Sequence, residues 1–290
     1  MTPEYVVVGH CALDVQPDGS FLPGGTVLYS ALTAARMGMR AGILTAGDPV
    51  ALADALAPFA GSFAIHILPT ATTTTFENIP TPAGRKQTLH GWAGPILPDA
   101  LPEAWRRASV LHLGPIADEL PPGPWADAIA ADWAGAWTIA TPQGWLRRWG
   151  AFPSPVRHDT LVLPDRLLDR LSAMVISIEE RDVAEEAVRR VARRGLGAIT
   201  YGPLGVDILQ GDSTTRVPTF PIAVRDETGA GDVFAAAWAV GLARGERPDV
   251  AARVACAAAS LSITAPGPRG IPTAEAIDAL LATNSDRSAR

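Results

Sequence analysis

Short runs of apolar and β-branched residues alternate along the chain with longer segments of helical periodicity. Alternation of this kind is typical of parallel βαβ units and predicts an α/β fold. We expect buried strands at Tyr5–Val8, Ile43–Ala46, Phe63–Leu68, Val110–Leu113, Thr138–Ala140, Val175–Ile178 and Ala198–Tyr201. Helices that cover the sheet are expected at Val27–Met37, Asp99–Ala108, Trp125–Trp133, Arg181–Arg194 and Val233–Arg244.

Two stretches break the alternation, one from Asp14 to Pro23 and one from Thr72 to Pro95. The second is rich in β-branched and turn-forming residues, which favour strands joined by tight turns. We expect both stretches to form strands outside the main sheet. From the residues alone, the plain interpretation is an exposed β-hairpin with no gating role.

Composition narrows the class of protein. Of the 290 residues 48% are hydrophobic, which is enough for a large core. The formal net charge of −6 and the lack of a basic run argue against nucleic acid as a partner. Cys11 and Cys256 are too few for a disulfide framework, so a cytoplasmic protein is expected. No apolar segment reaches membrane-spanning length, and the first residues do not resemble an export signal.

The most informative stretch is DETGAGDVFAAAWAVGLARG, residues 226–245, in which a Gly-rich turn opens onto an apolar helix. The first N–H groups of a helix lack intrahelical partners and carry partial positive charge, so phosphate suits this position. Gly229 and Gly231 can adopt positive φ and carry no Cβ. Their N–H groups and that of Ala230 can therefore turn toward one bound anion.

Asp232 follows this turn at the start of the helix. Its carboxylate would lie where the phosphate meets an acceptor, and it could take the proton from an attacking hydroxyl during phosphoryl transfer. The alternative is a tight strand-to-helix turn in which Asp232 is an ordinary acid of a first helical turn, favoured there by the helix dipole.

The sequence TGAGD followed by an apolar helix resembles the C-terminal signature of the ribokinase-like (PfkB-type) carbohydrate kinases. A second match lies at residues 23–38, PGGTVLYSALTAARMG, which resemble the N-terminal pattern of the family. The resemblance implies a single domain over residues 1–290, built as a three-layer α/β sandwich with a mostly parallel central sheet. Residues of about 14–23 and 72–95 would contribute a small β lid that closes over the sugar.

The resemblance also implies an ATP-dependent kinase for a hydroxyl of a small sugar or polyol. Asp232 would be the general base, and the helix start at Gly229, Ala230 and Gly231 would be the anion hole. Residues expected to bind the acceptor are Asp14, Gly24, Gly25, Asn78, Arg85 and Gln87. Residues expected to bind the nucleotide are Thr200, Gly202, Gly205, Thr228, Gly229 and Gly231.

The sequence indicates a metal site less clearly than it indicates the phosphate site. Glu180 follows a predicted strand where the family commonly has Asn-x-x-Glu, so it is expected to organise waters around Mg²⁺, with Ser177 in place of Asn. A sparse protein site suits magnesium, which keeps much of its own water. An acidic helix start is the alternative. Asp226 is expected at a monovalent-cation site of the K⁺ type.

Some residues depart from the pattern of the family, including Glu227, Tyr29 and Ser177. The exchange at Tyr29 and the segment VGHCALDV resemble the inositol-kinase branch more than ribokinase itself. Alternatives are therefore a nucleoside kinase and a catalytically silent ligand-binding member. A dinucleotide-dependent oxidoreductase also has a Gly-rich helix start, but its fingerprint follows the first strand. A homodimer formed through the lid is a further expectation.

Overall fold

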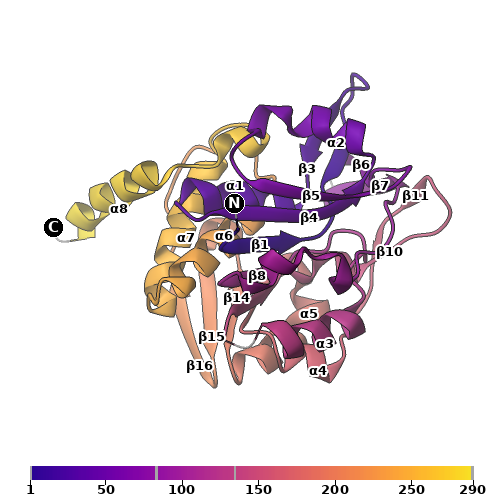
Figure 1. The fold of residues 1–290 in the computed structure, drawn as a ribbon. Coiled ribbons are helices and arrows are strands. Elements are labelled where there is room, and N and C mark those ends of the chain that lie inside the picture. The colour runs from indigo at the N-terminus through magenta and orange to yellow at the C-terminus, as the bar shows by residue number, and fades with distance from the viewer. Residues whose placement is uncertain (1, 82–83, 134, 289–290) are drawn as a thin grey trace.

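The computed structural model describes residues 2–81, 84–133 and 135–288. Its centre is a nine-stranded sheet with the order β16-β15-β14-β13-β9-β8-β1-β4-β5 (Figure 1). These strands are β1 (Tyr5–Val8), β4 (Ala41–Gly47), β5 (Ala64–Pro69), β8 (Val110–Leu113), β9 (Trp137–Ala140), β13 (Ala173–Ser177), β14 (Leu196–Thr200), β15 (Val206–Gln210) and β16 (Ser213–Val217).

Neighbouring strands from β5 to β14 run parallel, and β15 and β16 add an antiparallel edge. All four residues of β1 are fully buried, as expected for a strand that is covered on both faces. Parallel pairing brings the carboxyl ends of β1, β8, β9, β13 and β14 to one edge of the sheet. Ligands of α/β proteins usually bind beyond this edge.

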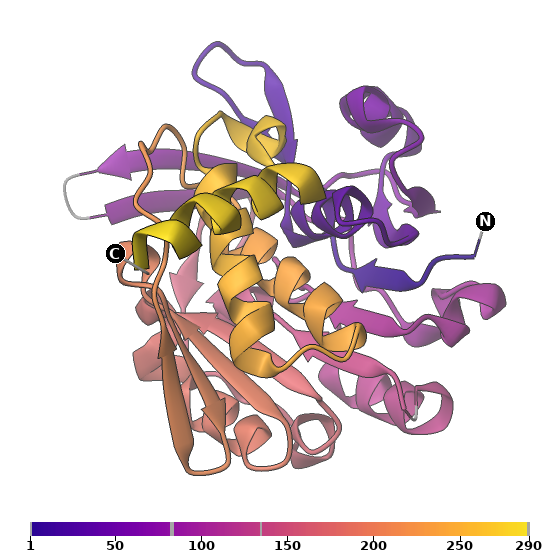
Figure 2. The same ribbon diagram turned by 90° about the vertical axis from the view of Figure 1, so that its left-hand side faces the viewer.

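Helices cover both faces of the sheet, so the predicted three-layer α/β sandwich is confirmed. Along β1, Tyr5 and Val7 face a core shared with α1, α6 and α7, whereas Val6 and Val8 face a core shared with α3, α4 and α5. In Figure 2 the orange to yellow C-terminal helices gather on one side of the molecule. The helices are α1 (Thr26–Arg36), α2 (Pro49–Leu56), α3 (Pro122–Asp132), α4 (Asp165–Leu168), α5 (Arg181–Ala192), α6 (Ala230–Ala243), α7 (Pro248–Ser262) and α8 (Ala274–Ser288).

A second sheet lies outside the first and has the strand order β11-β7-β6-β2-β3. Its strands are β2 (Ala12–Val15), β3 (Phe21–Gly24), β6 (Thr75–Thr81), β7 (Gly84–Gly91) and β11 (Ser154–Pro155). Both stretches that break the alternation in the sequence therefore form strands outside the main sheet, as predicted. We call this second sheet the lid sheet. A two-stranded ladder, β10 (Arg147–Arg148) with β12 (Arg157–His158), lies in the connection that leads to β11 and away from it.

Two details of the sequence-based prediction are wrong. The segment Asp99–Ala108 contains two separate 3-10 turns, Pro98–Ala100 and Glu103–Arg107, instead of a helix. Pro102 lies between them, and a proline in a helix interior removes a hydrogen bond and clashes with the preceding turn. The strand predicted as buried at Phe63–Leu68 is the edge strand β5, whose side chains are partly exposed because nothing pairs with its outer edge.

Within the described ranges, every helix falls short of the combination of length and apolar character that crossing a bilayer requires.

Candidate active site

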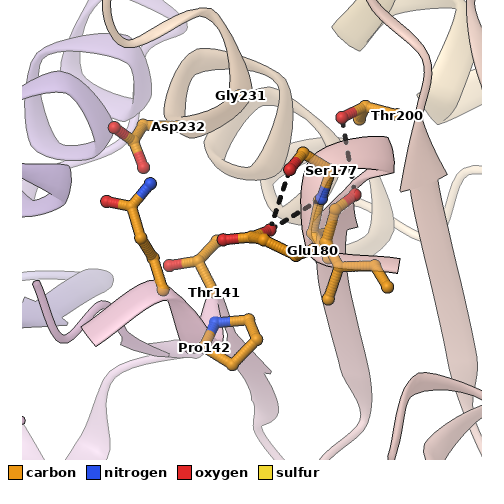
Figure 3. A pocket seen from close by; sticks show the side chains of 10 residues that line it. Thr141, Pro142, Ser177, Glu180, Thr200, Gly231 and Asp232 are labelled. Atoms are coloured by element: carbon orange, nitrogen blue, oxygen red, sulfur yellow. Dashed lines mark hydrogen bonds between the residues drawn. The ribbon is translucent and has the colours of Figure 1, made fainter. Parts of the chain in front are cut away.

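A pocket of about 80 Å³ lies beyond the carboxyl ends of β9, β13 and β14 (Figure 3). Its lining includes Glu180 and Thr200 on the strand side and Gly231 and Asp232 at the start of α6. Thr141, Pro142, Gln143, Val175, Ile176 and Ser177 complete the lining. A volume this small suits reacting groups and not a whole nucleotide, because sites for drug-sized ligands occupy ~300–1,000 Å³.

The Gly-rich turn leads into α6 as the sequence predicts. Gly229 is the N-cap of α6 and has the left-handed conformation, with φ 79° and ψ 2°. The amide of Ala230 donates a hydrogen bond to the carbonyl of Glu227 at 3.2 Å, so this amide is used within the turn itself. A Cβ added to Gly231 would have no neighbour within 4 Å, because this residue faces the pocket. We therefore expect the amides of Gly231 and Asp232, which line the pocket, to bind the anion.

Asp232 lies in the first turn of α6 and is partly buried. Its Oδ1 accepts a hydrogen bond of 2.8 Å from Thr26 Oγ1 at the start of α1, the helix that packs against α6. The start of α1 directly follows Gly24 and Gly25, two residues predicted to contact the acceptor. The predicted base on α6 is thus tied to the start of α1.

Tyr29 supports the turn from below. Its side chain is 3% exposed, and a Cβ added to Gly229 would lie 2.3 Å from two of its ring atoms. A Cβ added to Gly267 would lie 3.8 Å from the Tyr29 hydroxyl. The ring therefore packs against the Gly-rich turn, so the side chain at this position determines how much room the turn has.

The predicted acceptor residues form a chain of hydrogen bonds across the lid sheet. Asn78 Nδ2 donates to Asp14 Oδ1 at 2.9 Å, and Gln87 Nε2 donates to Asn78 Oδ1 at 2.8 Å. A Cβ added to Gly24 would lie 2.8 Å from Asp14 Oδ2, so a larger residue here would displace the Asp14 carboxylate from its present position. Gly25 follows as the N-cap of α1.

Arg85 pairs with Pro80 in the ladder between β6 and β7. Its side chain lies outside the described residues, so the prediction that it binds the acceptor stays a prediction.

Glu180 is 8% exposed and forms a capping box with Ser177. Its Oε2 accepts hydrogen bonds from the Ser177 amide at 2.8 Å and from the Ser177 hydroxyl at 3.1 Å. Burial raises the pKa of this carboxyl, although the Ser177 hydrogen bonds and the charge of Arg147 act against the rise. Among the described residues there is no cluster of three or more His, Cys, Asp or Glu side chains that could hold a metal ion.

The raised pKa of Glu180 predicts a pH-dependent cost to stability. In the unfolded chain this carboxyl ionises near pH 4.5, whereas in the folded protein it ionises at higher pH. The contribution of Glu180 to the free energy of unfolding is therefore fully present below pH 4.5 and is lost as pH rises through the folded pKa. Each unit of pKa difference corresponds to about 1.4 kcal/mol. The free energy of unfolding of Glu180→Gln should therefore gain on the wild type as pH rises from 4 toward neutrality, which denaturant titrations at a series of pH values would measure.

The control for this measurement is Glu179→Gln, because Glu179 is the exposed neighbour of Glu180. Its difference from the wild type should change less with pH, because the Glu179 charge is only the smallest of the causes that shift the pKa of Glu180. If both variants show the same pH dependence, the buried carboxyl is not its source.

The predicted nucleotide residues occupy two places. Thr200 ends β14 and lines the pocket, while Gly202 and Gly205 bound the 3-10 turn that follows. The Thr228 amide donates to Asp226 Oδ1 at 3.0 Å. The Gly267 amide donates to Asp226 Oδ2 at 2.8 Å, so this carboxylate ties the Gly-rich turn to the turn at Gly267–Gly270.

A neutral hydrogen-bonded row supports the floor of the pocket. Tyr5 Oη lies 2.8 Å from His112 Nδ1, and His112 Nε2 lies 3.1 Å from Thr141 Oγ1. Burial lowers the pKa of His112 to about 3 and raises that of Tyr5. His112 therefore stays neutral at physiological pH and serves to hold Thr141.

Sequence reasoning brought forward Gly231, Asp232, Glu180 and Thr200, and the structure brings these four residues to one pocket. It missed Thr26, although a polar residue directly after a Gly pair at the start of an apolar helix is a visible signal.

Comparisons with known proteins agree with the motifs. Residues 171–274 match the model of the pfkB family of carbohydrate kinases. Ribokinase from Bacillus subtilis (strain 168) is 44% identical over 84 residues, which make up 29% of this chain and 29% of that protein. The alignment thus spans under a third of the length of this curated relative.

Solved structures of low sequence identity share the whole fold. A pyrophosphate-dependent kinase in the ribokinase family, complexed with a pyrophosphate analog and myo-inositol, superposes with a TM-score of 0.76 at 21% identity. The alignment covers 95% of this chain and 99% of that one. Ribokinase from Arabidopsis thaliana, complexed with ribose and ATP, gives a TM-score of 0.74 at 22% identity over 97% of this chain and 99% of that one.

Proposed function

We propose that this chain, which matches the pfkB family of carbohydrate kinases over residues 171–274 and shares the fold of ribokinase, transfers a phosphoryl group from ATP to a hydroxyl of a small sugar or polyol. The observation that carries the proposal is the position of Asp232. This carboxylate lies at the start of α6, on the wall of a pocket shared with Gly231 and Thr200, and it is hydrogen-bonded from the acceptor side.

In the proposed reaction the acceptor hydroxyl gives its proton to the Asp232 carboxylate. The oxygen then forms a bond to the terminal phosphorus of the donor, and the bond from that phosphorus to its bridging oxygen breaks. The amides of Gly231 and Asp232, at the positive end of α6, stabilise the charge on the moving phosphoryl group. Positioning and electrostatics thus supply the catalysis, with no covalent intermediate on the protein.

Phosphoryl transfer from ATP uses Mg²⁺, and the pocket offers this metal a single buried carboxylate. Glu180 places one buried carboxylate on the wall that faces Asp232, which suits a metal held mainly by phosphates and water. When bound, Mg²⁺ would neutralise charge on the phosphates of the donor. Glu180 must be ionised for this role, so its raised pKa predicts weaker metal binding in acid.

We also propose a monovalent-cation site of the K⁺ type beside Asp226. The hydrogen bonds that this carboxylate accepts from Thr228 and Gly267 support a role in holding two turns together. A cation there would act on the same two turns.

The acceptor is proposed to lie against Asp14, Gly24 and Gly25 beneath the lid sheet. The row from Asp14 through Asn78 to Gln87 offers alternating hydrogen-bond acceptors and donors, which suits a ring of hydroxyl groups. A polyol such as myo-inositol is therefore our preferred acceptor, and a nucleoside is the second candidate. The solved relative that holds myo-inositol supports the same order.

The lid sheet also supports a proposed homodimer. Phe21, Leu22 and Ile79 on its strands are large apolar side chains with 53%, 51% and 45% exposure. Exposed apolar side chains on an edge strand such as β3 often mark contacts between proteins.

An acceptor panel tests the proposed function. Myo-inositol, ribose, fructose, phosphorylated sugars and nucleosides would each be offered with ATP and, separately, with pyrophosphate, and phosphorylated product would be measured. We expect transfer from ATP to a sugar or polyol. Transfer only to nucleosides would favour the nucleoside kinase, and transfer only from pyrophosphate would correct the donor.

The remaining outcome of this panel is ATP binding without any product. That result would identify a silent ligand-binding member and contradict the proposed function.

A further inference from the structure

Thr26 reaches the predicted base from the opposite half of the chain. It is the first residue of α1 and is 1% exposed. Its hydroxyl donates the hydrogen bond of 2.8 Å to Asp232 Oδ1, across 206 positions of sequence. A hydrogen bond to an ionised group is shorter and stronger than one between neutral groups.

The methyl group of Thr26 fixes the direction of this hydroxyl. A Cβ added to Gly114, directly after β8, would lie 2.5 Å from Thr26 Cγ2, so the methyl packs against the backbone at the end of that strand. A β-branched side chain has few rotamers, and contact on one branch determines where the other branch points. The hydroxyl is therefore held toward Asp232 before any ligand binds.

We propose that Thr26 is the positioning residue for the general base, so that α1 sets the orientation of a carboxylate on α6. This inference rests on the proposed function of Asp232. A fixed hydrogen bond at Oδ1 limits rotation of the carboxylate about its Cβ–Cγ bond. The proton-accepting geometry is then present in the ground state, which is where positioning lowers the barrier.

The position of Thr26 also links the base to acceptor binding. The edge strand of the lid sheet, β3, ends at Gly24, which lies against Asp14, and Gly25 then caps the helix that begins with Thr26. Of these three consecutive residues, Gly24 lies against Asp14, Gly25 caps the helix, and Thr26 holds the proposed base. An acceptor bound to Asp14 would therefore contact the same short segment that orients Asp232.

The test compares Thr26→Val with Thr33→Val. Thr33 is a matched control because it lies on the same helix, is also 1% exposed, and donates its hydroxyl to the Tyr29 carbonyl at 2.8 Å. Thr26→Val should lower kcat by about 10–100-fold while the KM values for acceptor and donor stay within about twofold. Thr33→Val should keep the kcat of the wild type. Thr26→Ser, which keeps the hydroxyl but loses the methyl that directs it, should recover part of the lost kcat.

The crystal structure of Thr26→Val adds a readout apart from turnover, since the Asp232 carboxylate should rotate away from its wild-type direction. If this valine variant does not fold, Thr26→Ala takes its place, because alanine removes the hydroxyl without adding bulk. Equal kcat in the Thr26 and Thr33 variants, with Asp232 unmoved, would overturn the inference and leave the proposed function standing. A wild type that phosphorylates nothing, or an active Asp232→Asn, would instead overturn the proposed function, and the inference would fall with it.

Discussion

Replacing Asp232 with Asn should lower kcat by about 10²–10⁴-fold, the range that a positioned general base contributes. The amide has nearly the same shape but cannot accept the proton of the acceptor hydroxyl. Asn can still accept the hydrogen bond from Thr26 through its side-chain oxygen, so the local geometry should persist. Steady-state kinetics together with thermal unfolding would separate the loss of chemistry from any loss of fold.

Asp249→Asn is the matched control, because Asp249 is the acid in the first turn of α7, as Asp232 is in α6. It interacts with the same kind of helix end but pairs with Arg247 at the surface. If both variants keep the turnover of the wild type, Asp232 is only a residue that stabilises a helix start. That result would leave the pocket without a base.

The second large effect is expected at the N-cap of α6. Gly229→Ala should destabilise the protein by about 1–3 kcal/mol through backbone strain alone, because a non-glycine residue is costly at φ 79°. The new Cβ would also overlap the ring of Tyr29, which is buried and has little room to move. The turn must shift, so the amides of Gly231 and Asp232 should no longer point toward the proposed position of the donor phosphate. Denaturant unfolding and the KM for the donor would both report this.

Gly231→Ala is the contrasting variant in the same turn. Its Cβ would meet nothing within 4 Å, so the free energy of unfolding should stay close to that of the wild type. The methyl would project into the pocket where the phosphoryl group is proposed to lie, and donor binding should weaken. Comparable stability losses in the two glycine variants would contradict the difference that their surroundings predict.

Much of the fold could be predicted from the alternation of apolar strands and helices. The strand at Tyr5–Val8 and the strand at Val110–Leu113 have the predicted bounds, since buried parallel strands are written as continuous apolar runs. The segment Asp99–Ala108 was predicted to be a helix because its apolar positions suit one. Pro102 interrupts it, and local backbone chemistry outweighs periodicity there.

The site could be predicted only in part. The turn at Gly229–Asp232 and the carboxylate of Glu180 were visible because Gly-rich helix starts and acids at strand ends are local signals. The hydrogen bond from Thr26 to Asp232 was not predictable, because it depends on how α1 and α6 pack side by side on the sheet. The use of the Ala230 amide within the turn was also hidden, since it depends on the conformation of the residues before it.

The two helices joined by the hydrogen bond from Thr26 to Asp232 lie 206 positions apart in the sequence, and this has a consequence during synthesis. A nascent chain that has left the ribosome as far as α5 already contains α1 and the acceptor residues of the lid sheet, yet it lacks α6. Translation must pass Asp232, and α6 must dock between α1 and α7, before the pocket that Gly231 and Asp232 line can form. Ribosome stalling or early termination upstream of α6 would therefore release a polypeptide that has the lid sheet but lacks this pocket.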